Sequence, residues 1–255
     1  MHVFAIGMGL DQEAVGRLRR GVIDVGQEFR LDPQTLWETS SVTRMLTVAG
    51  MHHSVSSIGE RRYVAFSDKQ IALYDGLPLD GSGSVAAHDA GQLLPRWNAL
   101  PSLLEGEFCV ARIDLGADAA EVLQDPLGML PVFYAANGQG AVISTSASIV
   151  ASVLCLQRPD LMAIASFVAL GWAMRRHTFL ADIRILAGGA VHRLDTRGLR
   201  SNQHFGAASL LCRESRSPSV SALAEQLKQL TSAAVAVGGD VRCALTAGRD
   251  TRVMA

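Results

Sequence analysis

Charged residues are scarce in this chain of 255 residues. Lys and Arg number 23 against 24 Asp and Glu, so the formal net charge is −1, and only 18% of the residues are charged. A domain that binds nucleic acid usually carries a basic excess on one face, and a disordered chain is usually polar and highly charged. We therefore expect no nucleic-acid partner. With 49% hydrophobic residues, we expect the chain to fold around a core.

Cysteine is also sparse, and its four copies lie far apart, at Cys109, Cys155, Cys212 and Cys243. They form no Cys-x-x-Cys pair and no cluster with histidine, so the sequence predicts neither a zinc site nor a disulfide framework. Buried thiols in a reducing compartment are the simplest interpretation, and we expect a cytoplasmic protein.

Long hydrophobic runs are absent as well. The two most apolar uncharged stretches, residues 141–156 and 161–174, are each shorter than the roughly 20 residues that a membrane-spanning helix needs. The first residues, from Met1 to Leu10, lack the basic start of a signal peptide. We predict one buried strand followed by two buried helices over residues 141–174, and no association with a membrane.

Short apolar runs separated by turn residues dominate the first 145 residues and indicate antiparallel strands. We predict strands over residues 3–6, 63–67, 71–74, 108–115, 121–124, 132–135 and 141–145, with a short helix over 85–94. Two helices follow, capped by Ser146 and Asp160, and the second should end at Gly171. A hairpin over 190–194 and 199–202 completes an α+β layer structure.

The pattern changes after a polar segment rich in Ser that also holds Pro218. Residues 220–237 have helical spacing, with Leu223, Leu227 and Leu230 on one stripe, and residues 241–245 form a short apolar strand. A helix, a turn, a strand and a Gly-containing loop are how an α/β nucleotide-binding layer begins. We divide the chain into a domain over 1–208, a linker over 209–219 and the start of a second domain over 220–255.

The most distinctive local feature lies where the last strand would give way to a helix. A loop at such a junction directs backbone N–H groups and the positive end of a helix dipole at one point, which suits a phosphate. The hydroxyls of Thr246 and Thr251 can donate to phosphate oxygens, and Asp250 could hold Mg²⁺. The nucleotide-binding candidates are Leu245, Thr246, Ala247, Gly248, Asp250 and Thr251. An ordinary turn capped by Asp250 remains the alternative at this point.

The run Thr246-Ala247-Gly248-Arg249-Asp250-Thr251 resembles the Ser-Gly-Gly-x-Asp-Ser pyrophosphate loop of the ATP pyrophosphatases, specifically that of the asparagine synthetase family. Upstream segments are similar to that family's Leu-x-Gly-x-Phe, Arg-Asp-x-x-Gly-x-x-Pro-Leu-Tyr-Tyr, Ser-Ser-Glu and Gly…Thr-x-Phe…Ile…Leu-x-x-Gly runs. In this chain they are residues 104–108, Asp114, 124–134, 144–146, Gly171, 178–179, Ile183, Leu186 and 188–189, in the family's order.

The resemblance implies an Ntn-hydrolase-like αββα sandwich of the glutaminase type. After it would come the first helix and strand of an α/β ATP-pyrophosphatase domain, which is adenine nucleotide α-hydrolase-like. It also implies an ATP-dependent amide-forming ligase with ATP and Mg²⁺ as cofactors, in which a small-molecule or peptide carboxylate is adenylated and then attacked by an amine. The charge on departing pyrophosphate would be met by backbone N–H groups, hydroxyls and the metal.

Two departures from the family pattern matter. The family's glutaminases use an N-terminal cysteine as nucleophile, whereas here Met1 is followed by His2, and no Asn-Gly-Glu-Ile run is present. The resemblance therefore implies no catalytic residue in the first domain. It favours the Cys-less branch that resembles β-lactam synthetases and lasso-peptide cyclases. Ala247 replaces a family glycine, at a cost of about 1 kcal/mol if that position needs φ > 0.

Family members continue for a few hundred residues past the position of Ala255, so we expect a C-terminally truncated ligase that is inactive alone. The alternative is a non-catalytic Ntn-like module or remnant whose synthetase half is missing or supplied by a separate chain. A homodimer and an unrelated α+β binding or scaffold domain also stay open.

Overall fold

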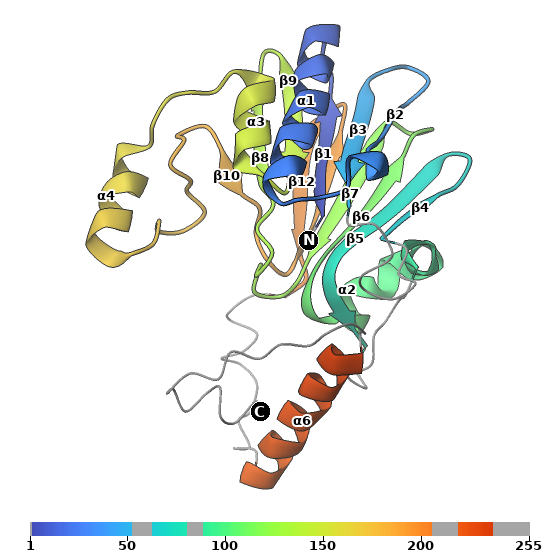
Figure 1. Cartoon of the computed structure of the whole chain (residues 1–255), viewed down its shortest axis with the longest axis vertical. Helices are drawn as coiled ribbons and strands as arrows, with labels where there is room; N and C mark the ends of the chain where they lie inside the picture. The colour runs from blue at the N-terminus through green and yellow to red at the C-terminus, as the bar shows by residue number, and fades with distance from the viewer. Residues whose placement is uncertain (1, 53–62, 81–88, 206–218, 237–255) are drawn as a thin grey trace.

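The computed structural model describes residues 2–52, 63–80, 89–205 and 219–236 (Figure 1). Within them lie two six-stranded sheets in which every neighbouring pair of strands is antiparallel. The first sheet has the order β10-β8-β9-β1-β3-β2, with β1 Val3–Met8, β2 Trp37–Ser40, β3 Leu46–Met51, β8 Phe133–Asn137, β9 Gly140–Ser144 and β10 Arg184–Ile185. The second has the order β12-β11-β7-β6-β5-β4, with β4 Val64–Phe66, β5 Gln70–Leu79, β6 Glu105–Asp114, β7 Ala119–Gln124, β11 Ala190–Asp195 and β12 Gly198–Gln203.

Alternation along the strands builds the central core between the two sheets. Side chains two residues apart on a strand share one face, so Phe4, Ile6 and Met8 of β1 all face the second sheet. Cys109 and Ile113 of β6 belong to the same core cluster and face them from the second sheet. The buried core therefore fixes the register of both sheets, because a slip of one residue would expose the whole set.

Helices cover the outer face of the first sheet. Helix α1 (Gln12–Glu28) begins at Asp11, whose carboxylate accepts a hydrogen bond from the N–H of Ala14. It packs beside α3 (Ala147–Leu154), and the two helices lie side by side in Figure 1. Val3 and Ala5, on the second face of β1, belong to the cluster that these helices bury.

A second helical layer lies on the outer face of the second sheet. It consists of the 3₁₀ helix η3 (Ala90–Ala99) and the short helix α2 (Leu100–Leu103). Leu93 and Trp97 pack there with Tyr74 and Val110. The layers therefore run helix, sheet, sheet, helix, and the predicted αββα order is confirmed.

Most predicted strands and helices of the sandwich are confirmed within one to five residues of their expected ends. The helix expected over 85–94 is observed from Ala90 as η3, and residues 85–88 lie outside the described part. The elements that were missed are α1, β2, β3, α2 and β10, together with a 3₁₀ turn, η1 (Pro33–Thr35), that lies between α1 and β2. Helix α6 (Val220–Ala236) confirms the helix expected after the linker, and its predicted stripe is exposed at Leu223 and Leu230.

The prediction of two buried helices over residues 141–174 is wrong for the second one. Helix α4 (Leu161–Leu170) buries only Ala163, and it lies apart from the sheets in Figure 1. Its residues are apolar on every side, so the sequence has the composition of a buried helix although the fold places it on a projecting arm. No helix in the described ranges has both the length and the apolar character needed to cross a membrane.

Candidate functional site

The start of β1 is held by the segment 144–146. The hydroxyl of Ser144 donates to the carbonyl of Phe4 at 2.7 Å, and the N–H of Phe4 donates to Thr145 Oγ1 at 3.2 Å. Thr145 Oγ1 also donates to the carbonyl of His2 at 3.4 Å, and the N–H of Ser146 donates to Ser144 Oγ. This run, singled out in the sequence, therefore serves to position the first residues of the strand.

A cavity of about 260 Å³ opens beside His2, and we call it the β1 pocket. Its polar residues are His2, Asp75, Cys109, Thr145 and Ser146, and its apolar walls are Val3, Val25, Phe29, Leu130, Pro131, Phe133 and Ala147. Asp75 and Cys109 are direct cross-strand partners on β5 and β6, so their side chains point to the same face of the sheet. The pocket thus joins the two sheets at one end of the sandwich.

His2 is almost fully enclosed in this pocket, with 6% of its surface exposed. Its Nε2 lies 3.9 Å from Oδ1 of Asp75, which is ion-pair range for a protonated ring but longer than a hydrogen bond. The ring of Tyr63 lies against it with 4.0 Å between centroids, and Tyr63 contacts Tyr74 in turn. Aromatic packing and a nearby carboxylate therefore fix the imidazole.

Cys109 is the thiol that lines the β1 pocket. Burial raises the pKa of this thiol well above its ordinary value, and the negative charges of Asp75 and Asp125 raise the pKa further. Because the thiolate is the nucleophilic form of cysteine, Cys109 stays protonated and unreactive near neutral pH. The described residues of the β1 pocket therefore include no activated thiol.

Asp125 joins two sequence segments that lie about 60 residues apart. Its carboxylate accepts hydrogen bonds from the N–H groups of Leu127 and Met129, and its carbonyl accepts from Gly128 and Gly189. A Cβ on Gly188 would lie 2.4 Å from the backbone nitrogen of Gly128, so this approach requires glycine. The segments 124–134 and 186–189, both part of the family resemblance, therefore meet in space.

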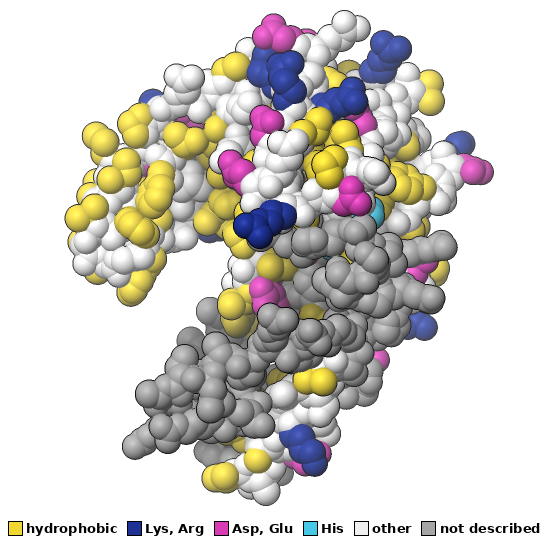
Figure 2. All heavy atoms as spheres, viewed as in Figure 1, with side chains coloured by type: hydrophobic (Ala, Val, Ile, Leu, Met, Phe, Trp, Pro, Cys, Tyr) yellow, Lys and Arg dark blue, Asp and Glu magenta, His cyan; other side chains and the backbone are white. Residues whose placement is uncertain are grey.

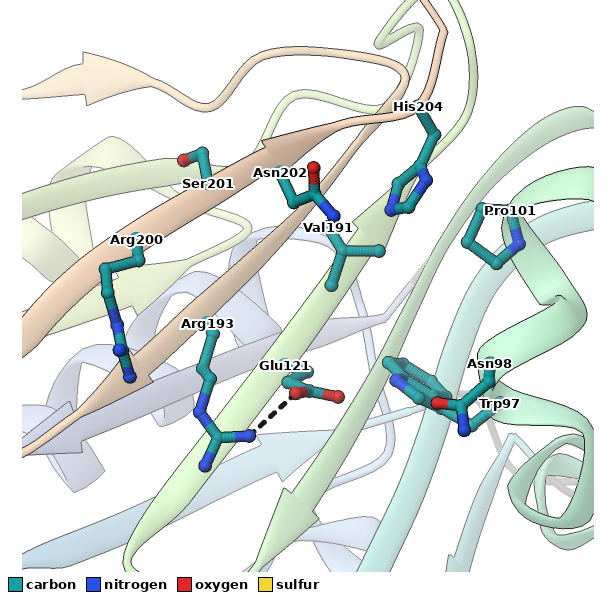
Figure 3. Close-up of a pocket in the computed structure, with 10 residues that line it drawn as sticks. All are labelled: Trp97, Asn98, Pro101, Glu121, Val191, Arg193, Arg200, Ser201, Asn202 and His204. Atoms are coloured by element: carbon teal, nitrogen blue, oxygen red, sulfur yellow. Dashed lines mark hydrogen bonds and ion pairs between the residues drawn. The ribbon is translucent and has the colours of Figure 1, made fainter.

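A second pocket, of about 390 Å³, lies on the outer face of the second sheet (Figure 3). Glu121 lies at its centre, 2.8 Å from Arg193 and 2.6 Å from Arg112. Asp195 pairs with both Arg193 and Arg200. Each of these three arginines is therefore compensated by a carboxylate.

Glu121 also shows how this network behaves electrostatically. Burial alone would raise the pKa of its carboxyl, but hydrogen bonds from Arg193 and Arg112 and the charge of Arg112 outweigh burial and lower the pKa. The carboxylate is therefore ionised at neutral pH. We assign this pocket to a structural ion network on the sheet surface, because each of these arginines and carboxylates already has an ion-pair partner.

The predicted phosphate loop cannot be placed. Leu245, Thr246, Ala247, Gly248, Asp250 and Thr251 all lie outside the described residues, as do the strand expected over 241–245 and most of the linker. In the part of the chain that is described, no group of three His, Cys, Asp or Glu side chains could hold a metal ion. Of the residues named for a nucleophile position or for nucleotide and metal binding, His2 is the one within the described residues, and it lies in the β1 pocket.

Sequence reasoning missed two neighbours of His2, Tyr63 and Asp75. Asp75 had a detectable signal, since it puts a carboxylate directly after the predicted strand 71–74. Tyr63 had none, because its contact with His2 joins residues 61 positions apart.

No protein-family model and no curated protein sequence matches the chain. Among solved structures, it is similar to a glutamine phosphoribosylpyrophosphate (PRPP) amidotransferase from B. subtilis complexed with ADP and GMP, at 10% identity and a TM-score of 0.47. It is also similar to a structure described as the allosteric regulatory enzyme of purine biosynthesis, at 11% identity and a TM-score of 0.49. Each match covers 80% of this chain and 49% of the other, so the chain spans about half the length of these structures.

Proposed function

We propose that this chain is the amidotransferase-like N-terminal part of an ATP-dependent amide-forming ligase of the asparagine synthase kind, and that its β1 pocket does not hydrolyse glutamine. The observation that carries the claim about glutamine is the enclosed His2 at the start of β1. Two observations support the assignment to such a ligase. Segments 124–134 and 186–189 meet at Gly128 and Gly188, and the sheets and helices form αββα layers.

Glutamine hydrolysis by covalent catalysis needs a nucleophile that a nearby base can activate. In the β1 pocket the thiol of Cys109 has a raised pKa, so the proton that attack must release is held tightly. The hydroxyls of Ser144 and Thr145 donate to backbone carbonyls and thereby hold β1 in place. The described part of the pocket therefore lacks an acidic thiol, and the two hydroxyls that hold β1 are already engaged in hydrogen bonds to the backbone.

In this proposal the ligase half begins with the phosphate loop. Leu245 to Gly248 would supply backbone N–H groups to the phosphates of ATP, Thr246 and Thr251 would add hydroxyl donors, and Asp250 would hold Mg²⁺. When bound, the metal would neutralise charge on the departing pyrophosphate. The acceptor of the adenylate would be a small-molecule or peptide carboxylate.

The loop is tested by Mg-ATP binding to the whole 255-residue chain, followed by ³¹P NMR. Asp250→Asn and Thr251→Val should each weaken binding at least tenfold, because each removes a contact to phosphate or metal. If position 247 needs φ > 0, Ala247→Gly should tighten binding about fivefold, which is the equivalent of about 1 kcal/mol.

The matched control is Thr196→Val, which removes a hydroxyl from the β11–β12 turn of the first domain. Its binding should equal that of the unmodified chain. Binding that is indifferent to Asp250 and Thr251 would contradict the ligase assignment and leave the alternative, a non-catalytic module.

A further inference from the structure

Residues 159–180, which we call the α4 arm, consist of α4 and a return segment over 171–180, and the two are joined by specific contacts. Asp160 caps the helix by accepting from the N–H of Ala163 at 3.0 Å, and it pairs with His177 Nδ1 at 2.8 Å. Nη1 of Arg184 lies 3.8 Å from the same carboxylate. Phe167 of the helix packs edge-on against Phe179 of the returning chain, with 5.1 Å between ring centroids. Helix and return segment therefore hold each other in place.

Two backbone contacts close the neck of this arm. Pro159 bridges to Leu180, and the N–H of Asp160 donates to the carbonyl of Phe179 at 2.8 Å. Arg158 pairs with Asp182 on the outside of the neck. The surface of the arm is thus preformed, which lowers the entropy lost when a partner binds.

That preformed surface is apolar. Nine large hydrophobic side chains on the arm are each more than a third exposed: Leu161, Met162, Ile164, Phe167, Val168, Leu170, Trp172, Met174 and Phe179. Figure 2 shows hydrophobic atoms gathered over this projection. A large apolar side chain offers roughly 150–200 Å² when fully free, so the nine present on the order of 900 Å². The largest apolar patch of a typical monomer is roughly 300–600 Å².

An apolar groove lies at the base of the same arm. It has a volume of about 570 Å³ and runs between α3 and the return segment. Phe133, Ile185, Ala147 and Ala151 line its body side, and Phe179 and Leu180 line its arm side. One chain therefore carries both a projecting apolar helix and an apolar groove that can receive such side chains.

We propose that this surface joins two copies of the chain, with α4 of each copy packed against the arm and groove of the other. A two-fold arrangement brings the same patch of both subunits together and satisfies helix and groove in both copies at once. The roughly 900 Å² on each copy surrounds α4, so only part of it would face the partner, and a standard interface buries roughly 800 Å² per partner. This inference does not depend on the proposed function.

Charge favours a second copy over a lipid surface. Residues 161–174 contain no charged side chain, so two identical surfaces can meet without like-charge repulsion. A lipid surface would use the cations Arg175 and Arg176, but the carboxylates of Asp160 and Asp182 lie at the same neck. A flat bilayer would also leave the groove unfilled. The test therefore includes a measurement of vesicle binding.

The test is sedimentation equilibrium of the whole chain between about 1 and 100 µM. The unmodified chain should be a dimer with a dissociation constant in the micromolar range or below. Met162→Glu combined with Val168→Glu should raise that constant at least 100-fold, because two buried charges would face each other across the interface. These side chains are 77% and 80% exposed, so their replacement leaves the fold of the monomer intact.

Two matched variants decide whether the effect belongs to the arm. Val42→Glu changes a side chain that is 99% exposed on the β2–β3 turn, and Leu223→Glu changes an exposed residue of α6. Both should dimerise as the unmodified chain does. A monomer at 100 µM, or a dimer that only Leu223→Glu disrupts, would overturn the proposal. Co-sedimentation of the unmodified chain with phosphatidylcholine–phosphatidylserine vesicles, lost in the Met162→Glu/Val168→Glu variant, would assign the arm to a lipid surface instead.

Discussion

Helices α3 and α4 follow one another in the chain and have similar compositions, yet they have opposite environments. Both are uncharged and rich in Ala, Val, Ile and Leu. Helix α3 buries Ile149, Val150, Val153 and Leu154 against α1 and the first sheet, whereas α4 buries a single alanine. Apolar composition therefore tells that a helix needs a partner, and only the fold tells whether the partner lies within the same chain.

Truncation of a core side chain should give the largest difference between the two helices. Ile149→Ala removes a fully buried side chain and should lower the free energy of unfolding by about 2–5 kcal/mol. Val168→Ala on α4 should change it by less than about 0.5 kcal/mol, because that side chain is exposed.

Urea unfolding, followed by circular dichroism at a concentration below the dimer dissociation constant, measures both values. Equal losses for the two variants would mean that α4 is buried within the monomer, and the contrast between the helices would be wrong.

The alkylation rates of a buried and an exposed cysteine should also differ. Cys155 ends α3 at the exposed boundary with the α4 arm, and Cys109 lies in the β1 pocket with a raised pKa. Iodoacetamide should modify Cys155 at least 100-fold faster than Cys109, because the reagent alkylates only a thiolate that it can reach.

Peptide mapping by mass spectrometry gives the two rates within one sample. Comparable rates, or a faster Cys109, would show an activated thiol in the β1 pocket and would count against a silent site.

The neck of the arm should control α4 alone. Asp160→Ala removes the helix cap and the partner of His177, and hydrogen exchange over residues 161–170 should accelerate about tenfold while β1 and β3 keep their protection. Asp182→Ala is the control, because it breaks only an exposed pair with Arg158 and should change exchange less than twofold. Loss of protection in β1 would show that the arm is part of the sandwich core.

The same carboxylate gives the arm a defined pH dependence. The hydrogen bond from His177 and the N–H of Ala163 lower the pKa of Asp160 below its ordinary value of 3.8. A lowered pKa stabilises the folded arm fully above pH 3.8, and this stabilisation is lost as the pH falls through the folded-state pKa. Amide NMR signals of α4 should therefore broaden below pH 3.8. In Asp160→Ala, which lacks the titrating carboxylate, they should already be broadened at neutral pH and show no such transition.

Local signals in the sequence were sufficient to predict most strands and helices of the sandwich. The cap Asp160 and the αL glycine Gly171 marked both ends of α4, and both are observed in those roles. Helix α1 also had its signals, a cap at Asp11 and buried positions at Ala14, Leu18 and Val22, but three glycines within it weaken its helical pattern.

Contacts between distant residues could not be predicted. The exposure of α4 depends on which surfaces the fold leaves uncovered, and periodicity cannot report that for a helix that is apolar all round. The pairing of Asp75 with Cys109 follows from the register of β5 and β6. The closeness of His2 to Tyr63 depends on the packing of the two sheets.

Glutamine turnover tests the central claim most directly. The whole chain would be incubated with ¹⁵N-amide glutamine at neutral pH, and glutamate and ammonium would be followed by NMR. We predict no glutamate above the rate in buffer, for the unmodified chain and equally for His2→Ala and Cys109→Ala. Glutamate release by the unmodified chain that either substitution abolishes would contradict a silent β1 pocket.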